Sequence, residues 1–254
     1  MKTALITGAT SGIGKATAEK LAEKGYNLIL TGRRKERLDD IGKNIAEKFN
    51  VKILPLCFDV RDNDAVKSQI ENLPADMKNI DILVNNAGLA VGLTPIQSGI
   101  VDDWERMIDT NIKGLLYITR AVAPLMIERR KGHIINIGSI AGRDVYANGN
   151  VYCATKSAVD ALTKGMRIDL LPYNIRVSQI APGQAETEFS IVRFKGDEER
   201  AKKVYQGFDA LTAENIADAI LYVCEAPPHV NISDLLIMPT AQASINYIHR
   251  KNEG

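Results

Sequence analysis

Short apolar runs alternate with longer amphipathic segments along the whole chain, and this alternation constrains the fold more than any other feature. The apolar runs fall near 3–7, 27–31, 51–56, 80–84, 132–138, 174–180 and 235–238, and the amphipathic segments lie near 12–24, 35–48, 62–72, 102–127, 151–171 and 212–225. The short runs suit buried parallel strands, and the longer segments suit helices that cover them. The alternation therefore predicts an α/β protein with a doubly wound parallel sheet of about seven strands.

One segment interrupts this pattern. Residues 183–207 fit neither the strand nor the helix periodicity. A long excursion of this kind inside a compact domain is often a lid or a binding loop. No low-complexity linker divides residues 1–254, so we expect a single domain with a substrate loop near 183–207.

Charge and composition exclude several kinds of partner. The chain has 32 Lys and Arg against 31 Asp and Glu, so no basic field favours nucleic acid or an anionic membrane. The uncharged stretch 82–101 is interrupted by Asn85, Asn86 and Pro95, so we expect no membrane-spanning helix. Three separate cysteines without a C-x-x-C indicate a reducing, cytoplasmic compartment, and three scattered histidines indicate no metal site.

The first apolar run ends in a glycine-rich turn from which a helical pattern begins. Glycine permits a tight turn and a close approach of backbone to ligand, and free N–H groups at a helix start bind phosphate. The position at the first βα turn favours a dinucleotide site of the Rossmann type. The spacing differs from the usual G-x-G-x-x-G, and a turn without a ligand is the alternative. The expected cofactor contacts are Gly8, Thr10, Ser11, Gly12, Ile13 and Gly14.

The end of the second apolar run indicates which nicotinamide cofactor this turn would take. An NAD enzyme places an acidic side chain there for the ribose 2′-hydroxyl. This chain has Arg33 and Arg34 instead, and arginine forks suit the 2′-phosphate of NADP. Alternatively, the two arginines are a solvated pair that opens the next helix. Asp59 and Val60 follow the third run and suit the adenine, although Asp59 could equally cap the helix that begins near Asp62.

A tyrosine and a lysine four residues apart suit proton transfer. Tyr152 and Lys156 share one face of an expected helix, and a cation favours the phenolate of a side chain whose pKa is otherwise about 10. Alone the pair would be a surface contact, but it follows Ser139, which ends the fifth run where ligand crevices of α/β sheets lie. Ser139 suits a hydrogen bond to the substrate oxygen, since neither a histidine pattern nor Gly-x-Ser-x-Gly indicates a nucleophile.

These motifs, in this order, resemble those of the classical short-chain dehydrogenases/reductases. The resemblance covers essentially the whole chain and rests on the Thr7–Gly14 turn, Asn85-Asn86-Ala87-Gly88, Asn111, Ser139, Tyr152-Cys153-Ala154-Thr155-Lys156 and Pro182-Gly183. It implies that Asn111, Ser139, Tyr152 and Lys156 are catalytic, with Asn111 helping to maintain a proton relay and Lys156 bonding the nicotinamide ribose. It also implies cofactor contacts from Tyr152, Lys156, Asn85, Ala87, Gly88, Pro182, Gly183 and Thr187.

A closer resemblance lies in the substrate segment. Gly32-Arg33-Arg34, Thr187-Glu188-Phe189-Ser190 and residues 192–197 are similar to the bacterial and yeast NADP-dependent 3-hydroxy acid dehydrogenases. This resemblance implies a cytoplasmic homotetramer that oxidises serine, allo-threonine, 3-hydroxybutyrate or 3-hydroxypropionate with NADP. The pair Gln184-Ala185 departs from the apolar residues that those relatives usually carry there, and it borders the expected nicotinamide site.

A small hydroxy acid carries a carboxylate, for which an arginine offers an oriented two-point contact. Arg193, within the substrate segment, is therefore the predicted substrate partner alongside Ser139 and Tyr152. Arg143, just past Ser139, is the other candidate, and a solvated helical face is the alternative location for Arg193.

Two other functions stay open on the sequence. A short-chain reductase of an acyl-thioester, steroid or pterin ketone would keep the same motifs. A non-catalytic, cofactor-sensing module would keep the fold, although such modules commonly lose the tyrosine or the lysine that this chain has at 152 and 156.

Overall fold

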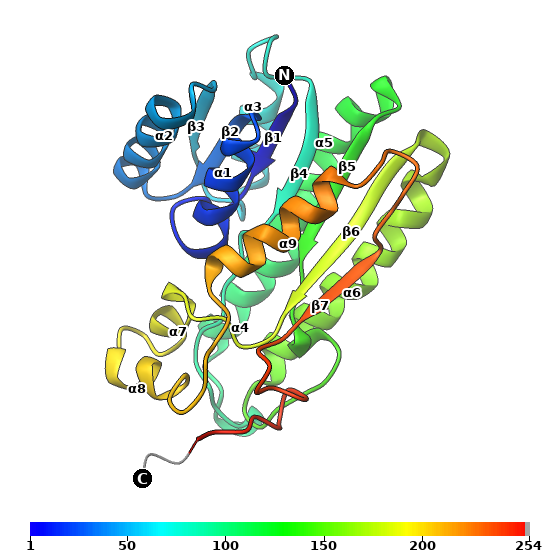
Figure 1. Cartoon of the computed structure of the whole chain (residues 1–254). Helices are drawn as coiled ribbons and strands as arrows, with labels where there is room; N and C mark the ends of the chain where they lie inside the picture. Colours follow the sequence, from blue (N-terminus) through cyan, green and yellow to red (C-terminus); the bar gives the residue numbers. More distant parts are fainter. Residues whose placement is uncertain (252–254) are drawn as a thin grey trace.

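The computed structural model describes residues 1–251, which form a seven-stranded parallel sheet with helices on both faces (Figure 1). The strands are β1 Thr3–Ile6, β2 Asn27–Gly32, β3 Ile53–Cys57, β4 Ile80–Asn85, β5 Gly132–Ile137, β6 Ile175–Pro182 and β7 Asp234–Ile237. Their order across the sheet is β3-β2-β1-β4-β5-β6-β7. The direction of winding reverses between β1 and β4, and ligands of open α/β sheets bind at the carboxyl ends of strands beside such a point. The predicted fold class is confirmed.

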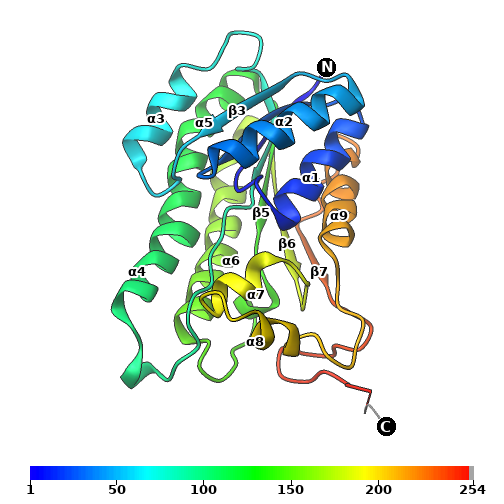
Figure 2. The same cartoon turned by 90° about the vertical axis from the view of Figure 1, so that its left-hand side faces the viewer.

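The helices within residues 1–251 lie in two layers. They are α1 Gly12–Glu23, α2 Lys35–Phe49, α3 Asn63–Glu71, α4 Val101–Ile108, α5 Leu115–Arg129, α6 Asn150–Leu170, α7 Glu188–Arg193, α8 Glu198–Lys203 and α9 Ala213–Glu225. Shorter turns are the π-helical Asp109–Gly114 and the 3₁₀-helical Ile96–Ser98, Ile140–Gly142 and Leu171–Tyr173. Figure 2 shows α1 and α9 on one side of the sheet and α4, α5 and α6 on the other.

Alternate side chains of each strand face opposite helix layers, because successive residues of a strand point to opposite sides of the sheet. In β1, Ala4 and Ile6 belong to the core shared with α1, α2 and α9, whereas Leu5 belongs to the core shared with α3, α5 and α6. Each is fully buried. Burying a leucine or isoleucine side chain stabilises a fold by roughly 1.5–3 kcal/mol. The sheet is therefore held firmly from both sides.

Two regions differ from the sequence prediction. The helix predicted over 102–127 is divided into α4 and α5 by the π-helical turn that contains Asn111, and such turns are frequent at functional sites. The segment 183–207 contains two short helices, α7 and α8, whose first turns are capped by the side chains of Thr187 and Asp197. Six-residue helices are too short to give a clear periodicity. Within the described residues, no helix combines the length and apolar character that spanning a membrane requires.

The glycine-rich turn makes a prediction about stability. A Cβ at Gly14 would collide with the carbonyl oxygen of Gly8 and with the side-chain nitrogen of Asn86, whereas a Cβ at Gly165 in α6 would meet nothing within 4 Å. We expect Gly14→Ala to lower the free energy of unfolding by about 1–3 kcal/mol through overpacking. The matched change Gly165→Ala should raise it by about 0.5–1 kcal/mol, because alanine restricts the unfolded chain. Urea unfolding measures both, and similar effects at the two positions would contradict the account.

Candidate active site

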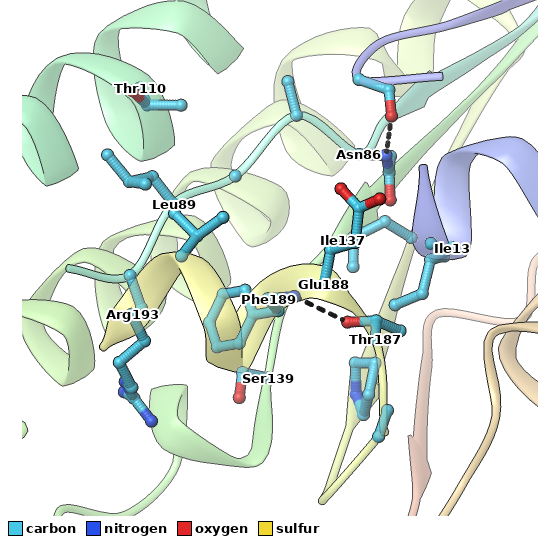
Figure 3. A pocket seen from close by; sticks show the side chains of 18 of the residues that line it. Ile13, Asn86, Leu89, Thr110, Ile137, Ser139, Thr187, Glu188, Phe189 and Arg193 are labelled. Atoms are coloured by element: carbon cyan, nitrogen blue, oxygen red, sulfur yellow. Dashed lines mark hydrogen bonds between the residues drawn. The ribbon is translucent and has the colours of Figure 1, made fainter. Parts of the chain in front are cut away.

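A cavity of about 480 Å³ opens at the carboxyl ends of the strands and contains most of the predicted site residues (Figure 3). It extends from the end of β2, past the glycine-rich turn, to the loops that follow β5 and β6. Its lining includes Gly8, Thr10, Ser11, Gly12, Ile13, Arg33, Arg34, Asp59, Val60, Ala87, Gly88, Ser139, Tyr152, Lys156, Pro182, Gly183, Thr187 and Arg193. Residues that are far apart in the sequence thus share one cavity of a size typical for a small-molecule site.

The glycine-rich turn brings bare backbone to the cavity. Gly8 and Gly12 have φ of +68° and +51°, which favour glycine, and a Cβ at Gly8 would come within 3.0 Å of the backbone of Ala87. The side-chain amide of Asn86 donates to the carbonyl oxygens of Thr7 and Gly8 at 2.8 and 3.2 Å, which fixes the turn against the loop after β4. The turn leads into α1, whose N-terminal N–H groups could hold a phosphate.

The arginine pair lies at the other side of this turn. Arg34 Nη2 donates to Thr10 Oγ1 and to Ser11 Oγ, both at 2.9 Å, and Arg34 Nη1 donates to a carboxylate oxygen of Glu188 at 3.1 Å. Arg33 is more exposed and lies with Nη1 3.8 Å from Asp59 Oδ2. These cations are solvent-accessible and occupy the position where an acidic residue would select NAD, so they could hold a 2′-phosphate.

Asp59 does not cap the following helix. The cap of α3 is Asp62, which accepts from the backbone N–H groups of Asp64 and Ala65. Both carboxylate oxygens of Asp59 instead accept from Arg61, at 2.7–3.1 Å, and Arg61 counteracts burial to hold the pKa of Asp59 below its usual value. Asp59 lines the cavity. An adenine amino group that bonded to the Asp59 carboxylate would share the carboxylate oxygens with Arg61.

The predicted catalytic side chains come from the end of β5 and from α6. Ser139 follows β5, and its hydroxyl accepts from the N–H of Ala141 at 3.1 Å. Tyr152 and Lys156 lie on one face of α6, with Lys156 Nζ 6.0 Å from the centre of the Tyr152 ring. Lys156 Nζ donates to the carbonyl oxygen of Ile137 at 2.8 Å. Burial lowers the pKa of Lys156 to about 8.

Arg193 is the cation that faces the tyrosine ring. Its guanidinium carbon lies 5.0 Å from the centre of the Tyr152 ring, 5.5 Å from that of Phe189 and 5.4 Å from that of Tyr146, whose hydroxyl accepts a hydrogen bond from Arg193. Burial raises the pKa of Tyr152 above its usual value, while Arg193 and the hydroxyl of Ser139 act in the opposite direction. Lysine was the expected source of this charge, but the structure brings the arginine closer to the ring.

Arg193 and Arg143 have different surroundings. Among the described residues, the buried Nε of Arg193 has no hydrogen-bond partner. Arg143 pairs with Asp234 and lies outside the cavity. Arg193 is thus a cation packed among aromatic rings within the cavity rather than a residue on a solvated face, and Figure 3 shows it beside Phe189. The structure therefore favours Arg193 over Arg143 as a group that meets a ligand.

Three predicted residues lie outside the cavity lining. Gly14 packs beneath the turn, and its role is to permit that packing. Asn85 is buried in β4, where its amide donates to Thr119 Oγ1 and Asn136 Oδ1, both at 2.9 Å. Asn85 was expected among the cofactor contacts, but it does not line the cavity, and Asn86 lines it instead. Asn111 is also buried.

The buried amide of Asn111 joins two parts of the site. Asn111 Oδ1 accepts from the N–H of Leu89 at 2.7 Å, and Nδ2 donates to the carbonyl oxygen of Leu89 and to Thr155 Oγ1 at 2.8 and 3.0 Å. The loop after β4 is thereby fixed to α6 within one turn of Tyr152. These bonds use both donors of the amide and one acceptor site of its oxygen. Asn111 therefore holds the wall of the cavity in place without lining the cavity itself.

Several lining residues were not predicted as site residues. Among them are Asn86, Tyr146, Glu188, Phe189 and Ile245. Ile245 lies near the end of the described chain and packs with Phe189 and Tyr146 against the cluster that contains Tyr152. Asn86, Glu188 and Phe189 lie within motifs of the sequence, but no pattern there predicts that their side chains meet the cavity. Only the folded chain brings them together with Tyr146 and Ile245.

The fold and the cavity together define a class of protein. The family model described as short chain dehydrogenase matches residues 2–198, and the chain belongs to this family. The predicted family is thereby confirmed.

Individual relatives match over nearly the full length. The chain is similar to the NADP-dependent 3-hydroxy acid dehydrogenase YdfG of Escherichia coli strain K12, with 48% identity over 97% of this chain and 99% of that protein. It is similar to the NADP-dependent 3-hydroxy acid dehydrogenase of Schizosaccharomyces pombe, with 44% identity over 98% of this chain and 97% of that one. Among solved structures, it resembles the closed form of serine dehydrogenase complexed with NADP+, with TM-score 0.91, 48% identity and coverage of 98% and 100%.

The buried lysine makes a prediction about stability and pH. Because the pKa of Lys156 falls from 10.5 to about 8 on folding, the unfolded chain binds more protons between these pH values. The wild type should therefore gain stability relative to Lys156→Met as pH rises through this window. Relative to the variant, the wild type should gain on the order of 2–3 kcal/mol of stability between pH 7 and pH 10. Urea unfolding at pH 7 and pH 10 measures this difference.

Lys164→Met is the matched control, since Lys164 lies on the same helix but is exposed. It should change stability little at either pH. A stability difference between wild type and Lys156→Met that is the same at pH 7 and at pH 10 would contradict the prediction.

Proposed function

We propose that this chain is an NADP-dependent oxidoreductase that transfers a hydride between the cofactor and a small 3-hydroxy acid. The observation that carries the proposal is one cavity whose lining includes the arginine pair after β2, Ser139 with Tyr152, and Arg193. The 3-hydroxy acid dehydrogenases among its relatives, and the serine dehydrogenase solved with NADP+, support it.

The residues of the cavity fit the parts of NADP in order. The glycine-rich turn and the start of α1 would bind the pyrophosphate, and the arginine pair would bind the 2′-phosphate. Asp59 and Val60 would border the adenine, while Lys156 would bond the nicotinamide ribose. The groups expected to border the nicotinamide half are Ala87, Gly88, Pro182, Gly183 and Thr187, all of which line the cavity. A side chain at Gly8 would meet the backbone of Ala87 at 3.0 Å, so the turn and the loop after β4 approach each other closely only with glycine there.

Ser139 and Tyr152 carry the proton chemistry. Bound NADP supplies the carbon that accepts the hydride during oxidation. Tyr152 takes the proton from the substrate hydroxyl, and Ser139 holds the same oxygen by a hydrogen bond. Since burial raises the pKa of Tyr152, the positive charge of Arg193 is needed to favour the phenolate, and Lys156 adds a second cation at this wall. Asn111 keeps α6 and the loop after β4 in place.

Arg193 would bind the carboxylate of the substrate. Its Nε is buried and lacks a partner among the described residues, and an unsatisfied buried donor is costly unless a ligand accepts from it. Its guanidinium lies against the Tyr152 ring, so a carboxylate bound there would stand close to the proton acceptor. In a molecule as small as serine or 3-hydroxybutyrate, this contact would supply much of the selectivity.

Arg193→Met tests the substrate class. The variant should raise KM for serine or 3-hydroxybutyrate by at least ~10-fold, because a charge-assisted hydrogen bond contributes roughly 1.5–3 kcal/mol. KM for a neutral secondary alcohol of similar size should change much less. NADPH absorbance in steady-state assays measures both. Arg143→Met, outside the cavity, is the control, and an equal rise in KM for the acid and for the neutral alcohol in Arg193→Met would rule out the carboxylate contact.

We also propose that the chain assembles into a homotetramer and works in the cytoplasm. Large apolar side chains that remain exposed in the single chain support assembly, among them Ile168, Leu171 and Tyr222 at 73%, 73% and 65% exposure. The three free cysteines support a reducing compartment.

A further inference from the structure

Glu188 is the first residue of α7, and it connects the substrate segment 183–207 to the arginines at the cofactor end of the cavity. Its carboxylate accepts from Arg34 Nη1 at 3.1 Å and from Arg37 Nη1 at 3.0 Å. Arg34 and Glu188 both line the cavity, while Arg37 projects from α2 beside it. One carboxylate from α7 is therefore held between two cations at the start of α2.

The same guanidinium of Arg34 also holds the glycine-rich turn through Thr10 and Ser11. Its donors are thus divided between that turn and Glu188. Burial tends to raise the pKa of Glu188, but the two arginines lower it below the usual value, so the side chain is anionic at neutral pH. An anion already stands where Arg34 would meet a phosphate.

We propose that Glu188 is a specificity-determining residue that competes with the 2′-phosphate of NADP for Arg34. This inference rests on the proposed binding of the 2′-phosphate by Arg34. A dianionic phosphate brought to Arg34 repels the carboxylate and takes over its donors, and NAD, which lacks that phosphate, leaves the pair intact. Glu188 therefore lowers the preference of the site for NADP over NAD.

The helix that Glu188 begins reaches the substrate end of the cavity. Helix α7 carries Phe189, whose ring centre lies 5.6 Å from that of Tyr152, and it ends at Arg193. Figure 3 shows Glu188, Phe189 and Arg193 on this helix.

Calorimetric titration of NADP+ and NAD+ into wild type and Glu188→Gln tests the competition. Glu188→Gln should tighten NADP+ by about 3- to 10-fold, the effect of removing one charge some 4–6 Å from a phosphate at a solvated site. The affinity for NAD+ should change less than about twofold, as an uncharged 2′-hydroxyl meets no such repulsion. Glu186→Gln is the matched control, because Glu186 is exposed, lies two residues away and is outside the cavity lining.

A double-mutant cycle with Arg34→Gln tests the competition by Glu188 separately from the binding of the 2′-phosphate by Arg34. Arg34→Gln alone should weaken NADP+ more than NAD+, and an equal effect on both would refute the phosphate role of Arg34. If that role holds, Glu188→Gln should lose its selective effect in the Arg34→Gln background. Unchanged or weaker NADP+ binding in Glu188→Gln would overturn the competition. So would equal tightening of both cofactors, an equal gain in Glu186→Gln, or a selective effect that persists without Arg34.

Discussion

The contact between the ends of β1 and β4 is the interaction on which the rest of the site depends. Thr7 Oγ1 accepts from the backbone N–H groups of Asn86 and Ala87 at 3.0 and 2.9 Å, while the amide of Asn86 returns bonds to the carbonyl oxygens of Thr7 and Gly8. These bonds fasten two central strands at the point where the winding of the sheet reverses. They fix the position of the glycine-rich turn relative to the loop after β4, which leads toward Tyr152. The two ends of the cavity are therefore held in place by one set of hydrogen bonds.

Positive charge is distributed unevenly along this cavity. At the cofactor end, arginines are exposed and share their donors with carboxylates and hydroxyls, so exchanging a partner costs little. At the substrate end, Lys156 and Arg193 are packed among apolar groups and aromatic rings, where each charge has a larger effect on its neighbours. Burial favours the neutral phenol of Tyr152, and the positive charge of Arg193 opposes this effect. The apolar surroundings therefore lower the stability of the fold by burying cations, and they also strengthen the effect of those cations on the tyrosine.

The sequence predicted the fold and the chemistry where local patterns carry them. Strand ends mark Ser139, a four-residue helical spacing pairs Tyr152 with Lys156, and the missing acid after β2 leaves Arg33 and Arg34. The sequence did not predict that Asn86 lines the cavity while Asn85 is bonded inside the core. Both follow the same apolar run, and only the pleat of β4 decides that Asn85 points into the helix layer while Asn86 reaches the cavity.

Long-range packing explains the remaining omissions. Tyr146, Glu188 and Ile245 come from loops or short helices without periodicity. Tyr146 reaches the cavity from the loop after β5, and Glu188 and Ile245 reach it because the chain after β6 folds back over the cavity. Arg193 was predicted as a ligand partner, but its stacking against Tyr152, which makes it part of the charge balance of the phenol, depends on that same folding.

We infer that Tyr152 transfers the proton, whereas the other cavity residues chiefly bind and orient the ligands. The most direct measurement combines calorimetric binding of NADP+ with stopped-flow turnover of serine or 3-hydroxybutyrate in Tyr152→Phe. The account predicts an affinity for NADP+ within about twofold of wild type and a rate lowered by at least ~10²-fold, the scale of lost acid–base catalysis. A variant that turns over at a near-normal rate would contradict it.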